Sequence, residues 1–185
     1  DEAVDVIVVG SGAAGLAAAV SAAQNGVQVL LLEKMPDIGG DTLISGGFYG
    51  AVDPVRQGAQ GIDDSEELFF EQTFRNGDEK ADPRLVRVLV KEAGRSLAWL
   101  ESLGMKFQPT VIEIYGAHWP RCHKPILPAG SGYIQTLSAA AIQKGVDIRT
   151  AVKVTRLELE KGRVIGVCAE VDEKICFYRA RKGVV

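Results

Sequence analysis

Three glycines near the start of the chain have the spacing of a phosphate-binding turn. Gly10, Gly12 and Gly15 fit the pattern G-x-G-x-x-G, which follows an apolar run and opens an alanine-rich segment. In such a turn the first glycine permits a tight bend and the second lets the backbone approach a pyrophosphate. The third lets a helix pack closely on a strand, and N–H groups at the start of that helix attract phosphate. The pattern therefore predicts a dinucleotide-binding turn.

The acidic residue Glu33 is placed to bind a ribose. It lies 23 residues after Gly10, at the end of a second apolar run. Its carboxylate can accept hydrogen bonds from a ribose diol and would repel a 2′-phosphate, which disfavours NADP. FAD and NAD share this much of the pattern. An NAD-dependent dehydrogenase therefore stays open at this point, as does a glycine turn with an exposed glutamate.

A second group of small residues favours FAD over NAD. Gly39-Gly40-Asp41-Thr42 and Ser45-Gly46-Gly47 follow shortly after Glu33. A loop of this kind, with free N–H groups, can surround the far phosphate of a dinucleotide and reach a flavin ring. A nicotinamide-binding unit normally turns into its next helix at this place.

The elements that must position these residues form a strand–helix–strand unit. We expect a buried strand at 4–9, a helix at 12–25 closed by Gly26, and a second buried strand at 27–32. Strands joined in this way run parallel with a right-handed crossover. The fold class is therefore α/β: a Rossmann-like βαβ domain with a parallel sheet, a β-hairpin layer and extra helices.

The rest of the chain alternates between helices, strands and irregular segments. Leucine and alanine recur at helical spacing in the helix 83–103, so their face is expected to pack on a core; these residues are Leu85, Leu89, Ala93, Leu97 and Leu100. Residues 34–61 and 111–130 are expected to be irregular. The sequence also predicts helices at 65–75 and 131–144, a strand at 146–149, a hairpin of 152–159 with 164–171, and the beginning of a strand at 181–185.

The block 33–47 resembles the FAD-binding domain of the fumarate reductase and succinate dehydrogenase flavoprotein family. It is most similar to the soluble flavocytochrome c-type fumarate reductases, and the resemblance continues through Arg121-Cys122-His123-Lys124-Pro125 to cover residues 1–185. The resemblance implies an FAD-dependent oxidoreductase that reduces or oxidises a C=C/C–C bond of a small carboxylate. The family's catalytic groups belong to a capping domain. We therefore expect the chain to be the N-terminal part of the FAD-binding domain, with a C-terminal strand and the capping domain missing and with little activity of its own.

The same resemblance implies a set of FAD contacts. Val154 would meet the adenine through its backbone, and the other expected contacts are Gly10, Gly12, Ala14, Gly15, Glu33, Lys34, Gly40, Asp41, Thr42, Gly46 and Gly47. Asp41 departs from the family, whose soluble members usually have asparagine there, and it places a carboxylate near the phosphates. Membrane-bound relatives attach FAD through a histidine in the second loop. Residues 41–50 contain no histidine, so we expect non-covalent FAD.

A group of cationic side chains lies between residues 118 and 124. It contains His118, Arg121, His123 and Lys124, and the resemblance places it beside the flavin and the substrate. These groups could attract a dicarboxylate, although a solvated surface loop is an equal alternative. Arg121 and His123 are the weak catalytic candidates, and no other catalytic residue is expected in this chain. Cys122 has cationic neighbours that could lower the pKa of its thiol.

Composition excludes several other classes of protein. The 185 residues carry a net charge of −3 with a pI near 5.5, which argues against nucleic-acid binding. The three cysteines form no CxxC pair, and no spacing typical of a metal site is present. Residues 6–32 lack charge but are interrupted by glycines and polar residues, so no membrane span is expected.

Several functions remain open for the whole protein. The expected partners are a small-molecule carboxylate and an electron donor such as a cytochrome or a quinone-linked protein. Alternatives keep the FAD but change the substrate, as in ketosteroid or tricarballylate dehydrogenases. The chain could also be an isolated, non-catalytic dinucleotide-binding fragment.

Overall fold

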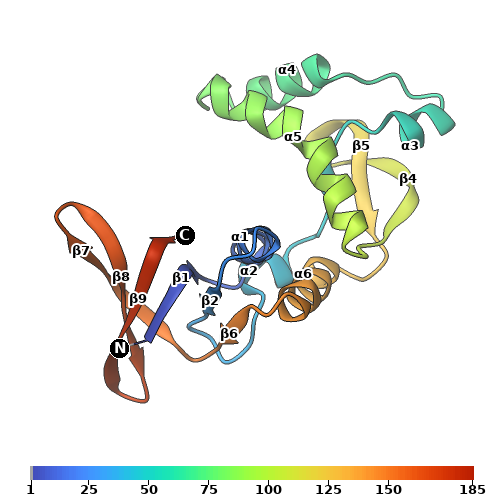
Figure 1. Cartoon of the computed structure of the whole chain (residues 1–185). Coiled ribbons are helices and arrows are strands. Elements are labelled where there is room, and N and C mark those ends of the chain that lie inside the picture. Colours follow the sequence, from blue (N-terminus) through green and yellow to red (C-terminus); the bar gives the residue numbers. More distant parts are fainter. Residues whose placement is uncertain (1) are drawn as a thin grey trace. The chain divides into compact units, whose positions relative to one another are not determined.

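The computed structural model describes residues 2–185, which form two compact units (Figure 1). The first unit combines the residues up to 45 with residues 133–185, so it is discontinuous in sequence. The second unit is the continuous segment 46–132. Each unit contains a sheet of its own.

The first unit is built on a six-stranded sheet in the order β6-β2-β1-β9-β8-β7. Neighbouring strands run parallel from β6 to β9, whereas β8 and β7 are antiparallel to their neighbours. The expected parallel sheet and hairpin are both confirmed, and the hairpin continues the sheet. The strands are β1 (Glu2–Val9), β2 (Val29–Leu32), β6 (Asp147–Arg149), β7 (Lys153–Glu160), β8 (Arg163–Val171) and β9 (Lys174–Val184).

The predicted strand–helix–strand unit is present at the start of the chain. α1 (Ala13–Gln24) joins β1 to β2, and Gly26 adopts a φ of +76° just after the helix ends. All four residues of β2 are buried, because the strand lies between two others in a covered sheet. α2 (Gly40–Ile44) and most of α6 (Ser131–Gln143) complete the unit.

β9 is longer than the sequence suggested. Residues 181–184, expected as the beginning of a strand, are the end of β9, which starts at Lys174. β9 pairs antiparallel with β8 and parallel with β1. Its inward residues Tyr178 and Ala180 join a core with Ile7 and Leu30. Residues 172–174 are all charged and resemble a loop in the sequence. The first part of β9 was therefore not predicted.

The second unit contains a three-stranded sheet in the order β3-β5-β4. The expectation of an irregular segment at 111–130 is wrong, because β4 and β5 occupy most of it. Three prolines and Gly116 lie in this stretch. Pro125 ends β5, and Pro120 lies where the register between β4 and β5 shifts, a place at which a strand tolerates proline. The elements are β3 (Tyr49–Gly50), α3 (Pro54–Ala59), α4 (Glu66–Asn76), α5 (Pro83–Ser102), β4 (Phe107–Ile114) and β5 (Ala117–Pro125).

The buried face of α5 is shifted from the expected one. Asp82 caps the helix, and its side chain accepts a hydrogen bond from the N–H of Arg84. However, Leu85 and Leu89 are 69% and 57% exposed. The buried positions are Val86, Val90, Ala93, Leu97 and Leu100. Both sets of residues recur at helical spacing, so periodicity alone could not show which set is buried at the start of the helix.

Segment 34–61 is less irregular than expected, because it holds α2, β3 and α3. Within residues 2–185, no helix combines the length and the apolar character needed to cross a membrane.

Candidate functional site

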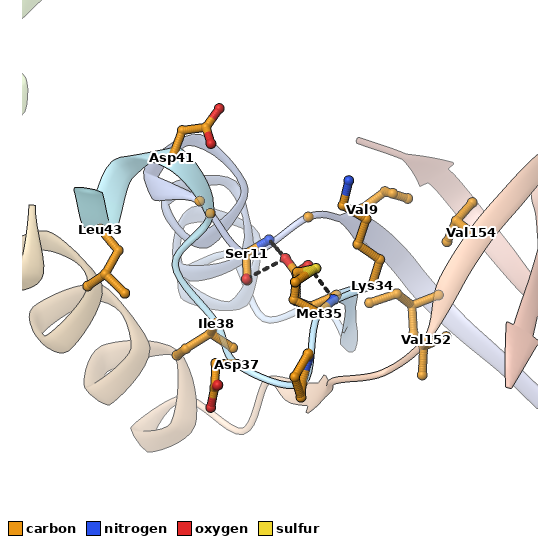
Figure 2. Close-up of a pocket in the computed structure, with 16 residues that line it drawn as sticks. Val9, Ser11, Lys34, Met35, Asp37, Ile38, Asp41, Leu43, Val152 and Val154 are labelled. Carbon is orange, nitrogen blue, oxygen red and sulfur yellow. Dashed lines mark hydrogen bonds between the residues drawn. The ribbon is translucent and has the colours of Figure 1, made fainter. Parts of the chain in front are cut away.

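A cavity of about 690 Å³ lies in the first unit where β1 and β2 end and α1 begins (Figure 2). The carboxyl ends of parallel strands are the usual ligand-binding edge of such a sheet. Lys34 and the pair Val152 and Val154 lie around the cavity in Figure 2. The lining comes from residues 9–12, 32–38, 40, 41, 43, 152 and 154.

The glycine turn presents bare backbone to this cavity. Gly10 has a φ of +97°, and a Cβ there would meet no atom within 4 Å. Gly12 is the N-cap of α1 and provides no side-chain acceptor for the first turn. A Cβ on Gly15 would lie 2.0 Å from the carbonyl oxygen of Gly10. Gly10 therefore forms the bend and Gly15 permits the close helix packing that their spacing predicts, and Gly12 presents no side chain to the cavity.

The carboxylate of Glu33 is buried beside this turn and is held by three hydrogen bonds. Its Oε2 accepts from the backbone N–H of Ser11 at 2.8 Å and from the Ser11 hydroxyl at 2.5 Å. Its Oε1 accepts from the N–H of Met35 at 2.8 Å. Ser11 and Met35, labelled in Figure 2, thus approach the same carboxylate from two segments.

These contacts keep Glu33 ionised. Burial raises the pKa of Glu33, but the hydrogen bonds from the Ser11 side chain and from backbone N–H groups outweigh burial and lower the pKa below its ordinary value. A buried, ionised and oriented carboxylate can accept a hydrogen bond from a ligand hydroxyl. Its charge would repel a phosphate at the same point.

The second glycine bend packs against the first turn. Gly39 has a φ of +129° and donates its N–H to the Ser11 hydroxyl oxygen at 3.0 Å. The Thr42 hydroxyl oxygen accepts from the N–H of Ala13 at 3.0 Å. Asp41 lies in the first turn of α2, and in Figure 2 its carboxylate points away from Ser11.

The structure brings some of the expected site residues to the cavity but not all. Gly15 and Thr42 lie behind the lining, in contact with the turn. Ala14 is exposed on α1, and Gly46 and Gly47 belong to the second unit. The expected residues that line the cavity are Gly10, Gly12, Glu33, Lys34, Gly40, Asp41 and Val154.

Sequence reasoning missed several lining residues, among which Ser11 makes the most polar contacts. Its position inside the G-x-G pattern and its small polar side chain were the available signal. The others are mainly apolar and give no chemical signal: Val9, Leu32, Met35, Pro36, Ile38, Leu43 and Val152; Asp37 also lines the cavity.

The catalytic candidates Arg121 and His123 are buried inside the second unit. Arg121 makes two hydrogen bonds to the carboxylate of Asp64, at 2.9 and 2.7 Å. The ring nitrogens of His123, which is fully buried, lie 3.1 Å from Asp53 Oδ2 and 3.1 Å from the Tyr49 carbonyl oxygen. Both side chains are therefore engaged by acceptors of their own unit.

The expected cationic group does not form a single surface. His118 and Lys124 are exposed, whereas Arg121 and His123 are buried. The hypothesis of a lowered thiol pKa at Cys122 is wrong. Burial raises the pKa of Cys122, and the opposing effect of Arg121 is smaller.

A family model described as FAD binding domain matches residues 5–185. The chain belongs to this FAD-binding domain family. Membership supports FAD rather than NAD as the cofactor.

Individual relatives agree with the assignment to this FAD-binding domain family. "Fumarate reductase (cytochrome)" from Shewanella frigidimarina is 38% identical over 167 residues, which cover 89% of this chain and 29% of the relative. The structure of an open flavocytochrome c3 fumarate reductase matches with a TM-score of 0.94 and 33% identity, over 100% of this chain and 33% of that one. A 3-ketosteroid-Δ4-(5α)-dehydrogenase from Rhodococcus jostii RHA1 matches with a TM-score of 0.89 and 28% identity, over 100% of this chain and 45% of that one. The chain thus spans less than a third of the length of the Shewanella relative.

The cavity fits the adenosine diphosphate half of FAD. Gly10 and Gly12 line it with backbone alone, and a Cβ on Gly10 would meet no atom within 4 Å. The N–H of Gly10 donates to the Leu32 carbonyl oxygen at 2.8 Å, so the backbone N–H groups for a phosphate belong to the start of α1. Glu33 supplies one buried anionic acceptor beside the glycine turn. Backbone donors for phosphates and a carboxylate for the ribose are the groups that such a ligand requires.

Asp53 of the second unit yields a prediction for the acid stability of the chain. Burial raises its pKa, but hydrogen bonds from Arg56 and His123 outweigh burial and lower the pKa to about 2, from 3.8 when unfolded. This stabilisation is fully present above pH 3.8 and is lost as the pH falls through about 2. At pH 7 Asp53→Asn should lower the free energy of unfolding by about 2 kcal/mol, because the charge is lost while the capping oxygen remains.

Urea unfolding at several pH values measures this effect. The difference between wild type and Asp53→Asn should shrink as the pH falls below 4, and the exposed control Asp172→Asn should stay close to wild type throughout. A difference that does not change with pH would contradict the assignment.

Proposed function

We propose that the chain binds FAD non-covalently, with the adenosine diphosphate half in the cavity of the first unit. The observation that carries this proposal is the ionised Glu33 carboxylate, buried beside a glycine turn at the carboxyl ends of two parallel strands. Membership in the FAD-binding domain family supports the same cofactor. The absence of histidine from residues 41–50 supports non-covalent binding.

The proposed contacts run along the cofactor from the pyrophosphate to the adenine. The backbone of Gly10 and Gly12 faces the pyrophosphate, Glu33 accepts from the ribose, and the backbone of Val154 meets the adenine. The remaining proposed contacts are Ala14, Gly15, Lys34, Gly40, Asp41, Thr42, Gly46 and Gly47. Asp41 is tolerated because its carboxylate points away from the Ser11 side of the cavity (Figure 2).

FAD, when bound, supplies hydride transfer to or from carbon. The residues of this chain bind and orient the cofactor, and none is proposed as a catalytic acid or base. Arg121 and His123 are instead held by Asp64 and Asp53.

For the whole protein we propose reduction or oxidation of a C=C/C–C bond in a small carboxylate, with fumarate as the first substrate to test. The proposal rests on the names of the relatives, which include fumarate reductases at 33–38% identity. We further propose that residues 1–185 are the N-terminal part of an FAD-binding domain, completed by a strand and a capping domain. A cytochrome or a quinone-linked protein is the proposed electron donor.

A second candidate keeps FAD and changes the substrate. The 28% identity with a ketosteroid dehydrogenase extends over the whole chain, and the residues described here bind cofactor rather than substrate. A ketosteroid, or another unsaturated substrate, is therefore the alternative, as is a dinucleotide-binding fragment with no activity of its own.

The whole protein is expected to be yellow and to release its flavin on denaturation. No histidine in the second glycine bend is available to form a covalent link. Acid precipitation followed by absorbance of the supernatant measures the release, and flavin that stays with the precipitate would contradict non-covalent binding.

Glu33→Gln is expected to weaken FAD binding by about 1–3 kcal/mol, the scale of a hydrogen bond to a charged group. Titration of the apoprotein with FAD measures the affinity. Glu170→Gln, an exposed change on β8 of the same unit, is the matched control and should bind like wild type. Equal affinity in all three proteins would remove Glu33 from the site.

The reaction is tested on the whole protein with a reduced dye as donor and a series of unsaturated acceptors. Dye oxidation is expected with fumarate or a related unsaturated acid. Turnover with a ketosteroid and with none of the acids would replace the leading proposal by the alternative.

A further inference from the structure

Ser11 connects the acidic residue of the site to the second glycine bend. Its hydroxyl oxygen lies 2.5 Å from Glu33 Oε2 and 3.0 Å from the nitrogen of Gly39, and the residue is fully buried. We propose that Ser11 is a positioning residue that orients Glu33 to recognise the ribose hydroxyls of the nucleotide. This inference rests on the proposed function, since it concerns the same cavity.

The direction of each hydrogen bond follows from the partners. The backbone nitrogen of Gly39 can only donate, and an ionised Glu33 can only accept. The Ser11 hydroxyl must therefore accept from Gly39 and give its single proton to Glu33. No other arrangement satisfies both neighbours, so the hydroxyl has one fixed orientation.

Ser11 binds Glu33 through two groups at once. Its backbone N–H and its hydroxyl both donate to Oε2, while Met35 donates to Oε1. These contacts fix the carboxylate before a ligand arrives. Preorganisation of this kind improves affinity because less side-chain freedom is lost on binding.

Removal of the Ser11 hydroxyl takes away one of the three donors that hold the Glu33 carboxylate. In Ser11→Ala, Oε2 keeps only the backbone N–H, and the N–H of Gly39 loses its partner. The N–H groups of Ser11 and Met35 still hold the two oxygens, but the carboxylate is less firmly oriented, so its hydrogen bond to a ribose hydroxyl weakens. A merely structural role would instead weaken every adenine nucleotide by the same factor.

The test compares ADP with 2′,3′-dideoxy-ADP by isothermal titration calorimetry on the whole protein after its flavin has been removed. Wild type is expected to prefer ADP by about tenfold or more, the value of one hydrogen bond to a charged group. In Ser11→Ala this preference should fall to about threefold or less, while binding of the dideoxy nucleotide changes little. Ser138→Ala is the matched control, because the Ser138 hydroxyl donates only to a carbonyl of its own helix, outside the cavity lining. Thermal unfolding verifies that each variant is folded.

The outcomes separate this inference from the proposed function. If wild type prefers ADP and Ser11→Ala keeps the full preference, Ser11 does not orient Glu33 and the inference is overturned. If wild type binds both nucleotides equally, Glu33 does not recognise the ribose and the inference again fails, although the phosphate site stands. Absence of ADP binding by folded wild type would contradict the proposed site itself, and the inference with it.

Discussion

The buried carboxylate of Glu33 is the constraint on which the cavity depends. An ionised group out of water is costly unless donors surround it, and here they come from Ser11 and Met35. Ser11 reaches it only because β1 and β2 are adjacent and in register, with Val9 opposite Leu32. The turn after β1 and the residue after β2 are thereby brought together. The parallel pairing of two short strands thus builds the anionic side of the cavity.

The sequence predicts those features of the site that depend on residues close together in the chain. Continuous apolar runs predicted β1 and β2, and the glycine spacing predicted the turn between β1 and α1. The position of Glu33 at the end of the second run predicted its place at the sheet edge. The hydrogen bonds of Ser11 escaped prediction, because they join residues 22 and 28 positions apart and no local pattern specifies them.

Elsewhere the sequence was ambiguous for physical reasons. On α5, Leu85 and Val86 are adjacent in the sequence and both are apolar, so only tertiary packing decides which one is buried. The prolines and Gly116 between residues 111 and 130 led to the wrong prediction of an irregular segment where β4 and β5 lie. Gly46 and Gly47 follow the first-unit residue Ser45 directly but belong to the second unit, and small residues give no sign of such a boundary.

The discontinuous first unit has a consequence for how the chain folds. β1 pairs with β9 in a register that places Glu2 opposite Tyr178. The sheet of the first unit therefore joins two strands that are separated by most of the sequence. Contacts between such distant residues form slowly, since the loop between them loses conformational freedom before any pairing compensates. Segment 46–132 is continuous and can form most of its contacts at shorter range. During synthesis this inserted segment can fold before β9 emerges and pairs with β1 in the sheet of the first unit.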